Sequence, residues 1–70
     1  MEIKMKAIKL TGEQAYNIGI HHKLYRKNLN DSFELIMFES YENDGFILAR
    51  DERDFAVILI ENRVYTFYQK

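Results

Sequence analysis

The stretch FELIMFE, residues 33–39, decides the fold of this chain. Its residues suit a β-strand, whose side chains alternate between two faces with a period of two. Both faces of that strand would be apolar. One face carries Phe33, Leu35 and Met37, and the other carries Ile36 and Phe38.

Three further segments of strand length follow, rich in β-branched and aromatic residues. They are Phe46–Arg50, Phe55–Glu61 and Val64–Tyr68. Because the connections between them are short, we expect an antiparallel meander. Phe55–Glu61 is again apolar on both faces, whereas a solvated antiparallel sheet normally alternates apolar with polar residues.

The residues before this meander predict one strand and one helix. Residues 2–8 alternate apolar with charged side chains, which is typical of a half-buried edge strand guarded by lysines. The motif TGEQ, residues 11–14, is a capping box, in which the first and fourth side chains cap each other's backbone amides. We expect a helix over residues 12–28, stopped by asparagine and aspartate. Gly19 weakens this helix by about 1 kcal/mol, which suggests a close approach of another backbone.

The predicted order is β-α-β-β-β-β, in a single compact domain spanning residues 1–70. The fold class is α+β, with one helix packed on a curled antiparallel sheet. This outline is similar to the cystatin-like roll; a small barrel like the Sm and SH3 folds is the alternative. A resemblance in outline implies no activity. At 8.4 kDa and without cysteine, the chain has one small core and no disulfide to support it.

The chain carries more apolar surface than one helix on a sheet can bury. Projected at about 100° per residue, a helix over 12–28 shows two apolar stripes. They are Ala15, Ile18, His22, Tyr25 and Leu29, and, on the opposite side, Tyr16, Ile20 and Leu24. A strongly curled sheet could bury both. We expect instead that one stripe or the uncovered side of the sheet is an association surface. The favoured binding elements are the second stripe and the aromatic C-terminal strand at Tyr65, Phe67 and Tyr68.

The net charge of −1 conceals a division along the chain. Residues 1–30 hold six basic and two acidic groups, whereas residues 31–70 hold four basic and nine acidic groups. The segment His21–Lys27 mixes cations with an aromatic ring, so nucleic-acid binding through Lys23, Arg26 and Lys27 is the alternative function. The acidic groups gather in turns, where they are solvated or face a basic partner surface.

No catalytic or metal-binding pattern is present. His21 and His22 are adjacent, so their side chains diverge on a helix and do not hold one metal ion. We expect His22 to pack at the edge of the core and His21 to face solvent. The segment Asp51–Asp54 lacks the length of a calcium loop and reads as a turn in which Arg53 pairs with a neighbouring acid. We therefore expect no enzyme activity, no cofactor and no metal.

These features predict a small non-enzymatic interaction module, a regulator or inhibitor that binds a protein and forms a homodimer. The N-terminus interleaves charged residues, and the longest run made only of apolar residues, Phe55–Ile60, is six residues long. Neither a signal peptide nor a membrane span is expected, and a cytoplasmic location follows by default. A composition without cysteine or proline is typical of bacterial and phage accessory proteins.

Overall fold

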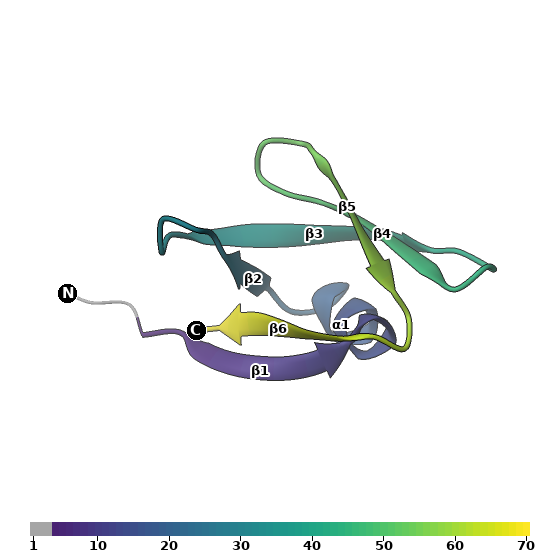
Figure 1. Cartoon of the computed structure of the whole chain (residues 1–70), viewed down its shortest axis with the longest axis horizontal. Coiled ribbons are helices and arrows are strands. Elements are labelled where there is room, and N and C mark those ends of the chain that lie inside the picture. The colour runs from purple at the N-terminus through teal and green to yellow at the C-terminus, as the bar shows by residue number, and fades with distance from the viewer. Residues whose placement is uncertain (1–3) are drawn as a thin grey trace.

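The computed structural model describes residues 4–70, which form six strands and one helix. The elements are β1 (Lys6–Thr11), α1 (Gly12–Gly19), β2 (Leu24–Lys27), β3 (Phe33–Tyr41), β4 (Phe46–Arg50), β5 (Ala56–Ile60) and β6 (Val64–Gln69). The strands make one antiparallel sheet in the order β1-β6-β2-β3-β4-β5. The sheet curls strongly, so that β4 and β5 run in a different direction from β1 and β6 (Figure 1). This arrangement confirms the predicted α+β roll. It remains open, because β1 and β5 are its two edges.

The capping box forms as predicted at the start of α1. The Thr11 hydroxyl accepts the Gln14 amide at 3.1 Å, and the Gln14 side chain accepts the Thr11 amide at 3.0 Å. The next amide, that of Gly12, donates to the carbonyl of Arg63 at 3.1 Å. A Cβ at Gly12 would overlap the carbonyl oxygen of Ile60. Only glycine therefore allows the helix to start this close to the backbone between β5 and β6.

The predicted helix over 12–28 is wrong beyond Gly19. Ile20 is the C-cap, and residues 24–27 form β2, which pairs with the first half of β3. Leu24 lies opposite Ile36 and is 0% exposed. Its burial and the ladder hydrogen bonds to β3 outweigh the helical periodicity of the isolated segment. The two helical stripes predicted over residues 15–29 therefore do not exist.

The meander is correct for β3, β4 and β5 and wrong for β6. A turn joins β5 to β6, with the Arg63 amide donating to the Ile60 carbonyl at 3.2 Å. The same turn lies against the start of α1, because the Glu13 amide donates to the Glu61 carbonyl at 3.0 Å. β6 consequently pairs with β1 and β2, not with β5.

The N-terminal strand is an edge strand, as predicted, and within the described residues it starts at Lys6, so that Lys4 and Met5, which the prediction included, precede it. Glu2 and Ile3, which the prediction included, lie outside the described residues. Lys6 and Lys9 are exposed on this edge. The expectation that lysines guard the edge is therefore met at these positions.

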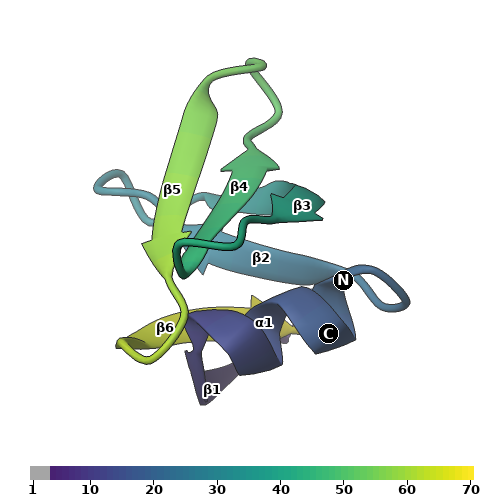
Figure 2. The ribbon, with the colours of Figure 1, turned by 90° about the vertical axis from the view of Figure 1, so that its right-hand side faces the viewer.

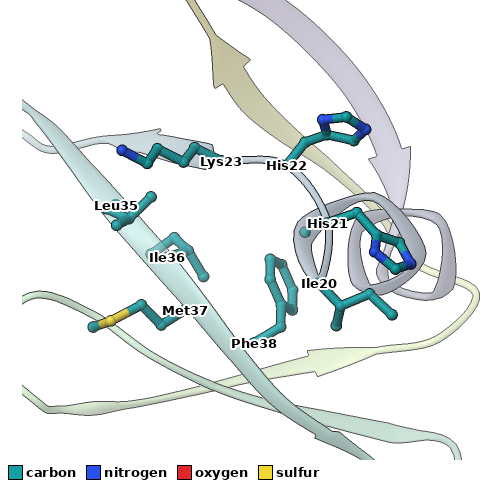
Figure 3. Close-up of a pocket in the computed structure, with 9 residues that line it drawn as sticks. Ile20, His21, His22, Lys23, Leu35, Ile36, Met37 and Phe38 are labelled. Atoms are coloured by element: carbon teal, nitrogen blue, oxygen red, sulfur yellow. The ribbon is translucent and has the colours of Figure 1, made fainter.

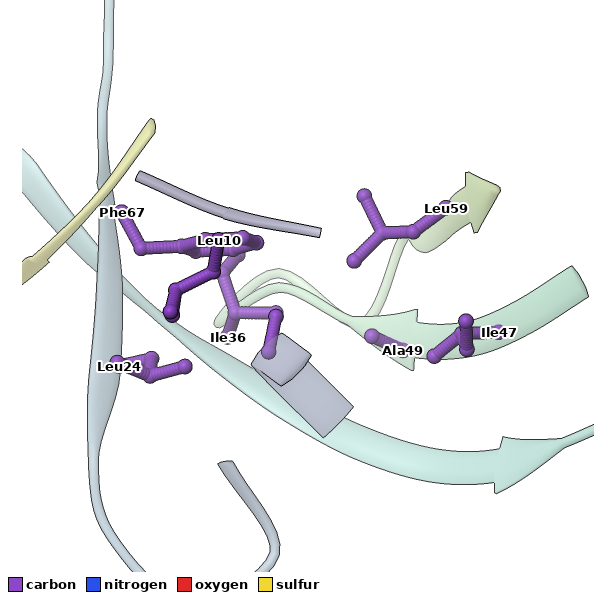
Figure 4. Packing of buried hydrophobic residues seen from close by; sticks show 8 residues of the cluster. Leu10, Leu24, Ile36, Ile47, Ala49, Leu59 and Phe67 are labelled. Carbon is purple, nitrogen blue, oxygen red and sulfur yellow. The ribbon is translucent and has the colours of Figure 1, made fainter. Parts of the chain in front are cut away.

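The core lies on the concave side of the sheet. Figure 2 shows α1 lying against β1 and β6, with the turn between β4 and β5 far from the helix. The helix contacts all six strands through this side. The buried apolar side chains come from every part of the fold (Figure 4): Leu10, Ala15, Leu24, Ile36, Ile47, Ala49, Leu59 and Phe67. The helix covers one side of the sheet, which leaves the convex side uncovered.

Candidate interaction surface

The convex side of the sheet is apolar along β3, β4 and β5. We call this surface the outer face; it consists of Phe33, Leu35, Met37, Phe46, Leu48 and Ile58. The exposed fraction is 44% for Met37, 41% for Phe46 and 59% for Ile58. The alternate residues of the same strands point into the core. The prediction that β3 and β5 are apolar on both sides is confirmed.

A shallow cleft of about 310 Å³ lies at one end of the outer face. Phe46, Leu48 and Ile58 form its apolar floor, and Leu48 is the direct cross-strand neighbour of Ile58. Glu42 and Asp44 stand at its rim and are exposed. An apolar floor beside two carboxylates suits a partner that brings apolar side chains and a positive charge.

A second cleft, of about 340 Å³, opens where the chain leaves α1 and diverges from β3. Ile20 and Phe38 line it near the end of α1, and His21, His22 and Lys23 lie along the segment that leaves the helix (Figure 3). Both histidines are exposed. The expectation for His21 is confirmed. The expectation that His22 packs at the edge of the core is wrong, because α1 ends at Gly19 and His22 lies in the exposed segment that follows.

A buried cluster of charges ties β2 and β3 to the turn after β4. Glu34 is 4% exposed and Asp51 is 1% exposed. The guanidinium of Arg26 lies 3.2 Å from the Glu34 carboxylate and 2.9 Å from that of Asp51. Arg53 lies 3.9 Å from both carboxylates, which confirms the predicted pairing of Arg53 with an acid. The cluster joins segments that are far apart in the chain.

Asp51 is held in its charged form. Burial alone would raise the pKa of its carboxyl, but the amides of Phe55 and Arg53 donate to it at 2.9 Å, and the charges of Arg53 and Arg26 add to their effect. The pKa is lowered as the net result. No buried side-chain nitrogen or oxygen within residues 4–70 lacks a hydrogen-bond partner. A cluster satisfied in this way serves the fold.

This cluster was not predicted from the sequence, although the sequence contains one signal for it. Glu34 belongs to the same face of its strand as Ile36 and Phe38, which point inward. A carboxylate in that position needs a buried cationic partner. The identity of the partner depends on the pairing of β2 with β3, which local periodicity does not contain.

A second polar contact closes the opposite end of the sheet. The Tyr41 hydroxyl contacts the carboxylate of Glu61, and it lies 3.3 Å from that of Glu13. The hydrogen bond to Glu61, followed by burial and the negative charges of both glutamates, raises the pKa of Tyr41 above its ordinary value of 10.0. This contact joins α1, β3 and the turn after β5, and it is structural.

The structure does not bring the predicted partner-binding residues together. Leu24 and Phe67 are core residues, at 0% and 3% exposed. The Tyr65 hydroxyl accepts the amide of Ile60 at 2.9 Å and is thereby engaged within the fold. Of the predicted set, Ile20 is the most accessible, at 47% exposed.

The remaining two predicted aromatic residues pack against rings of β3. Tyr16 is half-buried, and its ring meets that of Tyr41 edge to face with 5.6 Å between centroids. The ring of Tyr68 packs against that of Phe33 on the convex side, with 5.1 Å between the ring centroids. Tyr16 therefore belongs to the core side, and Tyr68 extends the outer face.

The three cations proposed for nucleic-acid contact do not share a helical face. Lys23 is exposed beside the second cleft. Arg26 belongs to the buried cluster, and the Lys27 ammonium lies 3.5 Å from the Asp31 carboxylate. The basic helix on which that alternative depended is absent from the described residues, since α1 ends at Gly19.

Comparison of the chain with models of protein families, with curated proteins and with solved structures finds no match. Within residues 4–70, no helix is long and apolar enough to cross a membrane. The same part of the chain contains no group of three or more histidine, aspartate or glutamate side chains arranged to hold a metal ion.

Proposed function

We propose that this chain is a non-enzymatic interaction module, of the regulator or inhibitor type, that binds a protein through its outer face. The observation that carries the proposal is the row of exposed apolar side chains along β3, β4 and β5. Water-exposed apolar surface of this extent is costly unless a partner covers it. Aromatic side chains such as Phe46 are effective anchors in protein interfaces.

The acidic rim indicates the chemistry of the partner. Glu42 and Asp44 stand beside the apolar floor made by Phe46, Leu48 and Ile58. The partner segment is therefore apolar and carries a lysine or arginine at one end. A cytoplasmic location and an origin in bacteria or phages are compatible with this role and remain part of the proposal.

Nucleic-acid binding has less support. Arg26 and Lys27 are engaged with carboxylates of the same chain. Lys23 is the remaining cation of the proposed set, and one lysine contributes little to binding a polyanion, because nucleic-acid affinity comes from contacts with several phosphates.

The proposal is tested by comparing capture of cellular proteins by three forms of the tagged chain. They are the wild type, the outer-face variant Phe46→Ser with Leu48→Ser, and the control Val64→Ser, whose side chain is 60% exposed at the start of β6. A protein retained by the wild type and the control is then purified. We expect the outer-face variant, with an unchanged circular dichroism spectrum, to bind it at least about ten-fold more weakly. Equal affinity of all three forms would refute the proposal.

A further inference from the structure

The two edge strands of the sheet, β1 and β5, differ in how well they are protected against pairing with another strand. β1 carries exposed lysines, Lys6 and Lys9, which discourage pairing with another strand. β5 has the sequence AVILI, without charge, proline or glycine. Its pairing with β4 is also regular over all five residues, so no bulge twists the edge away. An exposed, regular, apolar edge strand of this kind is a template for a further strand.

The hydrogen bonds at both ends of the β4–β5 ladder identify the backbone groups at this edge. The Asp51 amide donates to the Phe55 carbonyl, and the Glu61 amide donates to the Gly45 carbonyl, each at 3.0 Å. Bonds between antiparallel strands involve every second residue, so the odd-numbered residues of β5 bond to β4. The residues whose amides and carbonyls face the open edge are Ala56, Ile58 and Ile60.

One of these three residues is already engaged. The Ile60 amide donates to the Tyr65 hydroxyl at 2.9 Å, and its carbonyl accepts the Arg63 amide at 3.2 Å. Ala56 and Ile58 therefore offer two amides and two carbonyls to an incoming strand. Their side chains are exposed on the convex side, and no strand within residues 4–70 lies beyond β5 (Figure 2).

We propose that the incoming strand is β5 of a second copy of this chain, antiparallel, with the two-fold axis passing between the two Val57 residues. In this register Ala56 of each copy faces Ile58 of the other. Each such pair exchanges two hydrogen bonds, so four bonds satisfy all the open groups of both copies. An axis at Ile58 would instead pair Ala56 with the engaged Ile60.

The side chains also favour a second copy. Residues 55–60 are uncharged, so two antiparallel copies bring no like charges together along the strand. Ile58, 59% exposed, would pack beside Ala56 of the other copy on the convex side. The two outer faces would become one continuous apolar surface, and a two-fold contact of this type is closed.

This inference goes beyond the proposed function, because it places a second copy at the β5 edge and leaves the outer face of each copy open to another partner. The two proposals rest on different atoms. Dimerisation uses the backbone of Ala56 and Ile58, whereas partner docking uses the side chains of Phe46 and Leu48. We expect the Phe46→Ser, Leu48→Ser variant to remain dimeric, so failure of one proposal is distinguishable from failure of the other.

The first test is the solution mass, measured by light scattering over a dilution series. The wild type should reach twice 8.4 kDa. Ala56→Pro removes one edge-facing amide, and proline is tolerated on an edge strand whose amide faces solvent. That variant should stay at 8.4 kDa, while the control Ala56→Ser remains dimeric. A wild type that is monomeric up to about 1 mM would overturn the proposal, as would a folded, dimeric Ala56→Pro variant.

The second test measures the register by disulfide formation, since the chain has no cysteine of its own. The Cα atoms of two Val57 residues would lie about 4.5 Å apart, within the range of a disulfide. In the same register the two Phe55 residues are offset by four residues along the strand direction, so their Cα atoms would lie about 13 Å apart. Phe55 is 62% exposed and Val57 is half-buried, so random collision favours Phe55→Cys. Faster oxidation of Val57→Cys supports the register, and faster oxidation of Phe55→Cys contradicts it.

Discussion

The guanidinium of Arg26 on β2 lies 2.9 Å from the carboxylate of Asp51, which follows it by 25 residues in the chain. The contact links β2 to the turn between β4 and β5. Glu34 on β3 shares the same guanidinium. These ion pairs tie the turn of the β4–β5 hairpin to β2 and β3, and they thereby join the strands that carry the outer face.

Replacing Arg26 with methionine should strongly destabilise the fold, because it leaves two buried carboxylates without their main cation. We expect a loss of about 3 kcal/mol, at the low end for one partner of a buried pair, since the Arg26 side chain is 33% exposed. The control is Lys27→Met, which removes a surface pair to Asp31 and should cost less than about 1 kcal/mol. Urea unfolding measures both values. Equal losses would show that the cluster contributes no more than a surface ion pair.

The charge of Asp51 should make stability depend on acid pH. Its pKa in the folded state is below the ordinary 3.8, so the unfolded state binds the proton more tightly. The stabilisation is complete above about pH 4 and is lost as the pH falls through the folded pKa. Asp51→Asn should flatten this part of the curve of unfolding free energy between pH 7 and pH 2. Parallel curves for the two proteins would contradict this role for Asp51.

The sequence was informative where local pattern and tertiary structure agree. The period of two over residues 33–39 predicts β3 and its two apolar sides, and the motif at residues 11–14 predicts the start of α1. Both of these sequence patterns are local, because each involves only residues that are close together in the chain. The outer face could therefore be inferred from sequence, as a surplus of apolar side chains on β3 and β5.

The errors come from contacts between distant segments. Residues 20–27 fit a helical projection, and their strand alternation spans only the four residues of β2. Pairing with β3 and burial of Leu24 decide between the two structures. The same reason explains the unpredicted contact of Arg26 with Asp51, and the pairing of β6 with β1 rather than with β5. The predicted partner residues Tyr16, Ile20 and Leu24 do not share one face, because the helical stripe that would join them does not form.

The replacement of Leu24 by alanine distinguishes a core residue from a surface residue in this segment. Leu24 is 0% exposed, whereas Ile20 is 47% exposed. We expect Leu24→Ala to cost about 3 kcal/mol of unfolding free energy, from lost burial and the cavity that remains. Ile20→Ala should cost less than about 1 kcal/mol. Thermal or urea unfolding measures both losses. A larger loss for Ile20→Ala than for Leu24→Ala would show that Leu24 faces solvent, as the helical projection predicts.

The contact between Gly19 and Phe38 predicts a compensating pair of substitutions. A Cβ at Gly19 would overlap the Phe38 ring, whereas a Cβ at Gly12 would overlap the backbone oxygen of Ile60. Gly19→Ala should therefore cost about 1–2 kcal/mol in spite of the higher helix propensity of alanine. Phe38→Leu makes room, so the double variant should be more stable than the sum of the two single effects. Phe38→Leu should not improve Gly12→Ala, because the obstacle there is main chain. Strict additivity at Gly19 would mean that the ring moves aside without cost.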